Sequence, residues 1–84
     1  MGHRPRTKPK YLPKKLLAVR QRLGLSQPAL AKQLIISSKR ISEFESGRRE
    51  PDLIILLAYA RLADIPLESL IDDELVVDNL PGRN

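Results

Sequence analysis

The side chains best suited to chemistry in this sequence lie in one short segment between Ser37 and Gly47. Spacings of three and four residues bring several of them to one face of a helix, namely Ser38, Lys39, Ser42 and Glu43. All of these side chains are short or polar, and all can form hydrogen bonds to the edges of DNA bases. Ile41 and Phe44 fall on the opposite face. The segment is therefore expected to bury one face and to present the other for base recognition.

A simpler interpretation of this face needs no ligand. Lys39 and Glu43 are four residues apart, and such a pair can be a solvated helix pair that contributes only a few tenths of a kcal/mol, about 0.2–0.5. DNA contact is the favoured interpretation because of the helical motif in which the pair lies.

A second helix must hold the segment in place. Ser26 is a natural N-cap, Pro28 is tolerated in a first helical turn, and the apolar residues Leu30, Ala31 and Leu34 share one face. Only a few residues separate this helix from the one that follows Ser37, so the two must cross steeply. The second of the two then projects from the domain with one face free.

Three further helices complete an all-α fold, a compact bundle of about five short helices. The first begins at Leu12, carries Leu16, Val19 and Leu23 at helical spacing, and is ended by Gly24 in the left-handed conformation. A fourth, capped by Asp52, is expected to run to about Ala63. Pro66 is expected to open a short fifth helix, from Leu67 to about Asp72.

Charge and pattern divide the chain into three parts: a basic arm (residues 1–11), a helical domain (12–73) and an acidic, apolar tail (74–84). Residues 1–23 hold eight basic and no acidic residues, whereas residues 64–84 hold six acidic residues and one arginine. A basic front and an acidic back favour a protein that turns one face toward a polyanion. The alternative is that these charges only keep a small domain in solution.

Several classes of function are disfavoured. The chain has no cysteine and only one histidine, His3, so no metal centre, catalytic dyad or cofactor is expected, and an enzyme is disfavoured. The longest apolar run, Leu53 to Ala60, is too short to span a bilayer. Cytoplasmic localisation is expected, with no membrane partner and no small-molecule site.

The central segment resembles the XRE family of helix-turn-helix regulators, which includes the phage repressors and Cro proteins. The resemblance covers about residues 12–73 and is carried by Arg20, Gly24-Leu25-Ser26-Gln27, Leu30-Ala31, Ser37, Ile41-Ser42, Phe44-Glu45, Gly47, Pro51 and the Ile65/Leu67/Leu70 pattern. It implies a lambda repressor-like DNA-binding domain.

The resemblance also implies roles for matching residues. Ser38, Lys39 and Glu43 match base-reading positions. Ser42 and Arg40 flank them and are expected to touch bases or phosphates, with Ser42 assigned to the bases and Arg40 to phosphate. Gln27, Arg48 and Arg49 match positions that bind phosphate. Arg20 and Glu45 match an ion pair beneath the motif. The arm, with Arg4 and Arg6, is expected to follow phosphates or to enter the minor groove, unless it is only a disordered tail.

Three positions depart from the family pattern. Ile35 stands where a glycine is frequent, and a β-branched residue resists positive φ, so a different turn geometry is expected. Pro66 replaces a polar N-cap. Ile54 and Ala58 are apolar where the family is usually polar, which indicates either core variation or a dimer interface. Leu75, Val76 and Val77 are the other interface candidates, although the tail that holds them could instead fold back over the fourth helix.

The function expected from the sequence is specific binding of double-stranded DNA by a transcriptional regulator, most often a repressor in this family. It would act as a homodimer on an inverted repeat, as a bacterial or phage protein associated with the nucleoid. The alternative is an antitoxin-like protein that binds a protein partner and regulates its own synthesis through DNA. RNA binding is disfavoured because the chain holds only three aromatic residues, too few for stacking platforms.

Overall fold

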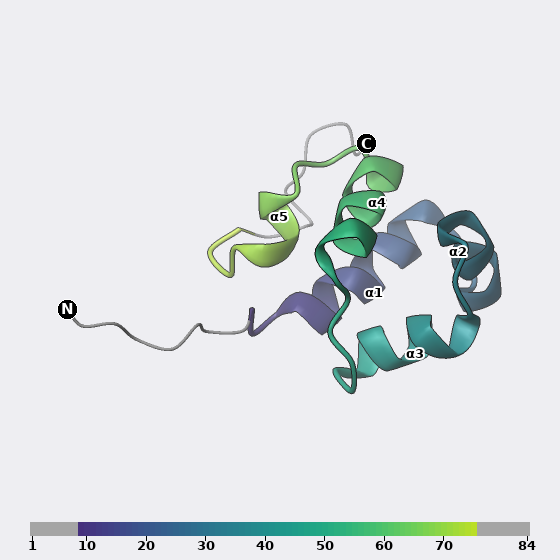
Figure 1. The fold of residues 1–84 in the computed structure, drawn as a ribbon. Coiled ribbons are helices and arrows are strands. Elements are labelled where there is room, and N and C mark those ends of the chain that lie inside the picture. Colours follow the sequence, from purple (N-terminus) through teal and green to yellow (C-terminus); the bar gives the residue numbers. More distant parts are fainter. Residues whose placement is uncertain (1–8, 76–84) are drawn as a thin grey trace.

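A computed structural model of the protein describes residues 9–75, which form an all-α bundle, as the sequence predicts (Figure 1). The helices are α1 (Leu12–Leu23), α2 (Gln27–Leu34), α3 (Ser38–Ser46), α4 (Leu53–Ala63) and α5 (Glu68–Ile71). No strand is present within residues 9–75. None of the helices in this range is long and apolar enough to cross a membrane.

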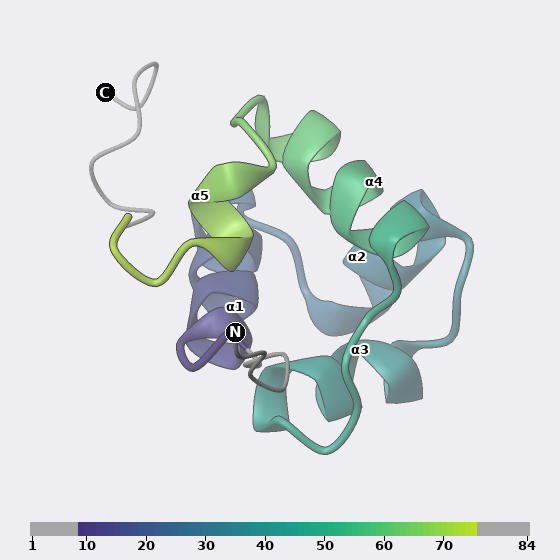
Figure 2. The same cartoon turned by 60° about the vertical axis from the view of Figure 1, so that its left-hand side comes forward.

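The core lies where α1 meets the other helices. α1 packs against α3, α4 and α5, and α2 packs against α3 and α4, an arrangement that Figure 2 shows from the side of α5. The largest fully buried side chains come from every helix: Leu16, Val19, Leu30, Ile41, Phe44, Tyr59 and Leu70. Each buried aliphatic side chain stabilises the fold by about 1.5–3 kcal/mol. The residues expected to face inward on α3, Ile41 and Phe44, are confirmed in that position.

The starts of three helices are fixed by side-chain caps that the sequence predicts. The Ser26 hydroxyl accepts a hydrogen bond from the Ala29 N–H, and Ser37 accepts one from the Arg40 N–H. The Asp52 carboxylate accepts one from the Ile55 N–H at 2.9 Å. These bonds satisfy backbone donors that a helix start leaves without partners. The start of α3 is therefore set by Ser37.

The first four helices end in the same way, at a residue in the left-handed conformation. These residues are Gly24, Ile35, Gly47 and Asp64. After each of them the next N–H returns to a carbonyl of the last turn, as the Ile36 N–H does to Ala31 at 3.0 Å. This closing bond defines the Schellman motif.

The expectation of a different turn geometry at Ile35 is wrong. Ile35 has φ 59° and ψ 48°, the conformation that glycine adopts elsewhere in the chain. The closing bonds of α2 require this conformation, and the Ile35 side chain is 90% exposed, so it meets no neighbour that would prevent it. The turn keeps its shape at a conformational cost of about 1–2 kcal/mol.

Replacing Ile35 with glycine is therefore expected to stabilise the protein. Removal of the left-handed strain outweighs the greater backbone entropy of glycine, so we expect a gain of about 0.5–1 kcal/mol. The gain is measured as a rise in the urea midpoint at constant m value. Ile35→Val keeps the β-branch and should show no gain. A loss of stability in Ile35→Gly would mean that the isoleucine side chain contributes packing.

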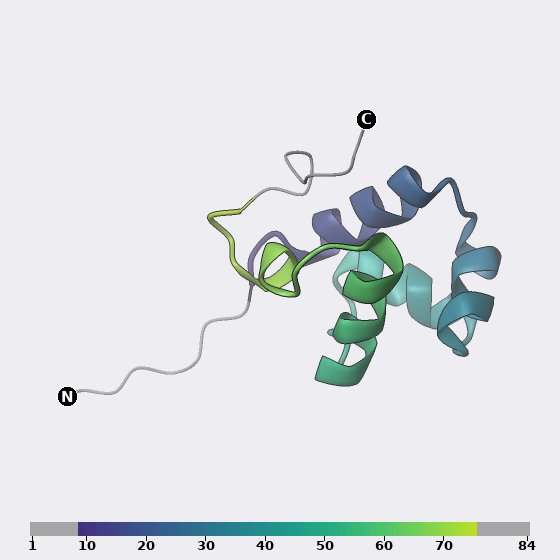
Figure 3. The same cartoon turned by 90° about the horizontal axis from the view of Figure 1, so that it is seen from above.

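The end of the described chain returns to the start of α1. Helix α5 is shorter than expected at both ends, because Leu67 acts as its N-cap without a side-chain hydrogen bond and Asp72 is already extended. Figures 2 and 3 both show α5 beside the first turns of α1. Asp72 and Asp73, which follow α5, make hydrogen bonds to residues of that region.

Candidate nucleic-acid interface

Helix α3 lies at the edge of the molecule (Figure 1), and its residues are buried on one face and accessible on the other. Ile41 and Phe44 anchor it to the core. The other face carries the predicted base-reading residues: Lys39 and Ser42 are exposed, whereas Ser38 and Glu43 are half-buried. The structure thus brings the predicted set together on one accessible face.

Beneath this helix, the predicted partners Arg20 and Glu45 form a two-pronged ion pair. Arg20 Nε donates to Glu45 Oε2 at 2.7 Å, and Arg20 Nη2 donates to Oε1 at 3.1 Å. The two side chains are only 17% and 6% exposed. The hydrogen bond to Glu45 raises the pKa of the Arg20 guanidinium. Arg20 Nη1 also donates to the Leu25 carbonyl. This single side chain of α1 therefore holds both α3 and the loop that precedes α2.

Gln27 joins the same network. Its Nε2 donates to Glu45 Oε1 at 3.0 Å. A glutamine amide has two N–H donors, so one remains for the phosphate that the sequence assigns to this residue. The bond to Glu45 holds the Gln27 side chain at the first turn of α2, in a fixed relation to α3.

Glu43 and Arg49, to which the sequence assigns separate roles in base reading and phosphate binding, instead meet each other. Arg49 Nε donates to Glu43 Oε1 at 3.0 Å, with side-chain exposures of 53% and 22%. Exposed pairs of this kind contribute only about 0–1 kcal/mol, so a ligand can open the pair. Arg48 and Arg40 are exposed and make no ion pair with any described residue.

The end of α3 lies against the start of α1. A Cβ atom placed on Gly47 would be 3.5 Å from Pro13 Cγ, and Arg48 shares a shallow hollow with Leu12 and Pro13. The basic residues around the end of α3 therefore adjoin the point where the basic arm joins α1. Arg4 and Arg6, predicted to bind phosphate, lie outside the described residues.

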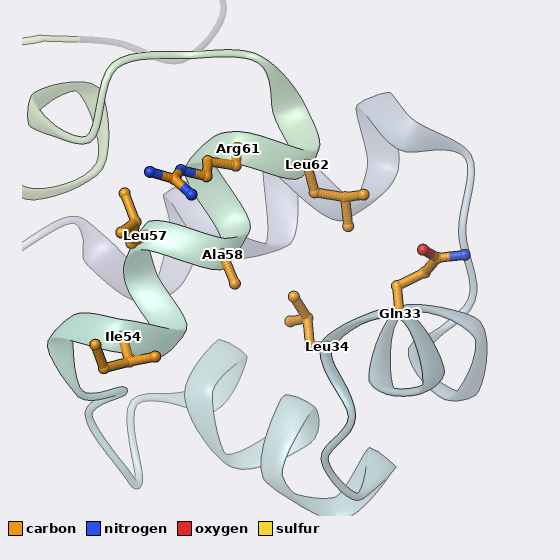
Figure 4. Close-up of a pocket in the computed structure, with 7 residues that line it drawn as sticks. All are labelled: Gln33, Leu34, Ile54, Leu57, Ala58, Arg61 and Leu62. Atoms are coloured by element: carbon orange, nitrogen blue, oxygen red, sulfur yellow. The ribbon is translucent and has the colours of Figure 1, made fainter.

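The predicted interface residues of α4 line an apolar groove between α2 and α4 (Figure 4). The groove has a volume of about 510 Å³ and is lined by Gln33, Leu34, Ile54, Leu57, Ala58, Arg61 and Leu62. Ile54 is 72% exposed, so it is not a core residue, and Ala58 is half-buried. Leu75 is exposed on a different part of the chain, and Val76 and Val77 lie outside the described residues.

Lys15 and Tyr59 bury polar groups that no sequence pattern predicts. Lys15 is 6% exposed, and its Nζ donates to the carbonyl of Asp72 at 2.6 Å. The Tyr59 hydroxyl is buried without a hydrogen-bond partner among the described residues, and burial raises the pKa of this phenol. The partner of Lys15 is 57 residues away, and Tyr59 lies within an apolar helix, so no local pattern marks either residue.

Residues 9–75 contain no group of three or more histidine, cysteine, aspartate or glutamate side chains placed to hold a metal ion.

The short helices α2 and α3 are joined by a turn with a left-handed residue, Ile35. α3 is exposed on one face and anchored from below by Arg20 and Glu45, and this arrangement defines a helix-turn-helix domain. Residues 16–70 match the helix-turn-helix family, and the chain belongs to this family, of the XRE type. The resemblance found in the sequence is thereby confirmed.

Solved structures give the same result. The P22 c2 repressor, crystallised with a synthetic operator, is 27% identical with a TM-score of 0.68, and the match covers 74% of this chain and 94% of that one. The restriction-modification controller protein C.AhdI from Aeromonas hydrophila is 28% identical with a TM-score of 0.65, over 71% and 91% of the two chains.

The fold also occurs inside a larger enzyme. Hydroxypropylphosphonic acid epoxidase from S. wedmorenis matches at 20% identity with a TM-score of 0.68, over 87% of this chain but 42% of that one. This similarity shows the fold alone. A search of curated proteins found no match.

Proposed function

We propose that this protein is a transcriptional regulator that binds specific sequences of double-stranded DNA through α3. The observation that carries the proposal is the open polar face of α3, held from below by the bonds among Arg20, Glu45 and Gln27. An anchored helix with accessible polar side chains can enter the major groove, where each base pair shows a distinct pattern of donors and acceptors. The P22 c2 repressor, similar over most of this chain, was crystallised with a synthetic operator, which supports the proposal.

The proposed contacts fall into two groups. Ser38, Lys39, Ser42 and Glu43 read base edges, while Gln27, Arg40, Arg48, Arg49 and the arm residues Arg4 and Arg6 bind phosphates. Phosphate contacts supply affinity and register, and base contacts supply specificity. Glu43 and Arg49 take up these roles when their exposed ion pair opens, or they bind as a pair with Arg49 positioning the carboxylate.

The proposed acting form is a homodimer on an inverted repeat, and the proposed regulation is repression. One module of this size covers few base pairs, and two-fold dimers of such modules place their recognition helices one turn of DNA apart. The groove with Ile54 and Ala58 offers an apolar surface that a second copy could cover. Such a regulator acts where the DNA is, in the cytoplasm, by binding rather than by catalysis.

Selection of bound duplexes from a pool of random sequences tests the proposal. We expect enrichment of one motif with two inverted half-sites. A single half-site would contradict the dimer but not the DNA binding. Failure to enrich any sequence, under salt conditions where the protein binds DNA, would overturn sequence-specific recognition.

Arg48→Ala is expected to weaken binding to all sequences about equally. Its exposed charge follows α3 without an ion pair among the described residues, so it is free to meet a phosphate. Loss of one phosphate contact lowers the slope of log K against log salt by about 0.9. Lys32→Ala, which removes the same charge at the end of α2, is the control and should change the slope less. A changed sequence preference in Arg48→Ala would contradict the phosphate assignment.

An antitoxin-like protein remains the alternative proposal. It depends on the segment from Asp72 to Leu80, most of which lies outside the described residues. The first two residues of that segment are engaged with the start of α1, which leaves less of it for a partner. A protein encoded beside this one that copurifies in stable, stoichiometric amounts would favour the alternative.

A further inference from the structure

Glu43 and Arg49 meet twice, once through the backbone and once through their side chains. The N–H groups of Arg48 and Arg49 both donate to the Glu43 carbonyl, at 2.9 and 3.2 Å, in the turn that closes α3. The Arg49 side chain therefore starts beside the last turns of α3, and its Nε donates to Glu43 Oε1 at 3.0 Å. The backbone fixes where both side chains begin, so rotation of the side chains is enough to separate them.

This ion pair opens at little cost. It has a single hydrogen bond, whereas the pair of Arg20 and Glu45 has two, and the Arg49 side chain is 53% exposed. Exposed pairs contribute little to stability because water competes for both charges. The Arg49 side chain makes no other hydrogen bond to the residues that the structure describes, and a guanidinium has five N–H donors.

The two side chains differ in what can replace the partner that each one loses. DNA offers phosphate oxygens to Arg49 along the whole backbone, whereas it offers a hydrogen-bond donor to Glu43 only at certain bases. Cytosine presents its N4 amino group, while guanine presents only the acceptors N7 and O6 in the major groove. A carboxylate among acceptors and phosphates is repelled. Glu43 is therefore expected to keep Arg49 as its partner at a guanine.

We propose that Glu43 and Arg49 form a switch that couples base reading to phosphate binding: Arg49 binds a phosphate only where cytosine has replaced it on Glu43. The inference rests on the proposed function, and it makes Arg49 a specificity-determining residue that touches no base. At guanine the pair stays closed and presents no net charge to the DNA. At cytosine the same two residues supply one base contact and one phosphate contact, so a guanine in that place costs both.

Salt dependence separates such a conditional contact from an ordinary one. Each phosphate contact adds about 0.9 to the slope of log K against log salt. Arg48 is the internal reference, because it is exposed, adjoins Arg49 and forms no ion pair with any residue in the described part of the chain. Its phosphate contact does not depend on the base that Glu43 meets, whereas the contact of Arg49 does.

The test measures the binding of four full-length proteins to two duplexes over a range of salt concentrations. The proteins are the natural chain, Glu43→Ala, Arg49→Ala and Arg48→Ala. One duplex carries the motif that the natural chain selects from the random pool. The other has guanine in place of the cytosine whose preference is lost when the selection is repeated with Glu43→Ala.

The natural chain is expected to show a steeper slope on the cytosine duplex, by about 0.9 for each half-site. Its preference for cytosine should accordingly fall about threefold for each half-site when the salt is raised from about 50 to about 200 mM. Glu43→Ala frees Arg49 on both duplexes, so both slopes should be steep and equal. Arg49→Ala should make both shallow and equal while it keeps a preference for cytosine. Arg48→Ala should lower both slopes alike and preserve their difference.

Equal slopes of the natural chain on the two duplexes would overturn the switch, and Arg49→Ala would then give the reason. A lowering of both slopes would show that Arg49 binds phosphate whatever Glu43 meets, and no change would show that the pair stays closed on DNA. A slope difference that persists in Arg49→Ala, or an unchanged motif in Glu43→Ala, would also overturn it. A natural chain without any preferred sequence would overturn the proposed function, and the switch with it.

Discussion

Arg20→Ala is expected to lower the free energy of unfolding by about 3 kcal/mol, at the lower end of the range for breaking a buried ion pair. The reason lies with Glu45, whose side chain is only 6% exposed and which would lose two of its three described hydrogen-bond donors. Gln27 alone cannot neutralise the buried carboxylate. The loss should appear as a lower urea midpoint with an unchanged m value.

A double-mutant cycle identifies the cause of this loss. Arg20→Ala combined with Glu45→Ala should cost less than the sum of the single changes, because neither partner is then left as an unpaired buried charge. The exposed pair of Arg49 and Glu43 is the matched control, and its coupling should stay below about 1 kcal/mol. Equal coupling energies in the two cycles would show that the pair of Arg20 and Glu45 contributes no more to stability than an exposed ion pair does.

Lys39→Gln is expected to change the preferred base at one position of each half-site from guanine toward adenine. The lysine side chain is exposed on the open face of α3 and can donate to O6 and N7 of guanine, whereas a glutamine amide pairs with N6 and N7 of adenine. The change in discrimination should be about 1–3 kcal/mol. The Glu43 carboxylate can accept a hydrogen bond from the N4 amino group of cytosine once its pair with Arg49 opens, so a further G·C pair is expected.

Repeated selection from the random pool with the Lys39→Gln protein measures this change. Arg40→Gln is the control, because the neighbouring residue is assigned to phosphate and its loss should weaken binding while leaving the preferred sequence as it was. An identical motif for Lys39→Gln and the natural chain would show that Lys39 does not read bases.

The features that the sequence alone determined are local ones. Helix starts at Ser26, Ser37 and Asp52 follow from a side-chain oxygen placed three residues before a backbone N–H, and this geometry needs no distant partner. The inward face of α3 follows from the spacing of Ile41 and Phe44. The partners Arg20 and Glu45 were found only because their positions matched a known family, not from spacing.

Tertiary structure decided the contacts between residues that are distant in the sequence, and those of residues that could bind more than one partner. Glu43 and Arg49 each carry a charge that suits a nucleic acid, and only the fold shows that they pair with each other. Ile35 adopts a left-handed conformation against its own preference, because the closing bonds of α2 outweigh the local strain.

The bonds from Asp73 to Lys10 and Tyr11 form only when α5 packs beside α1. Local patterns repeat every few residues and can be read from the sequence. A hydrogen bond across 63 residues depends on the position of the whole backbone, which the packing of the core sets.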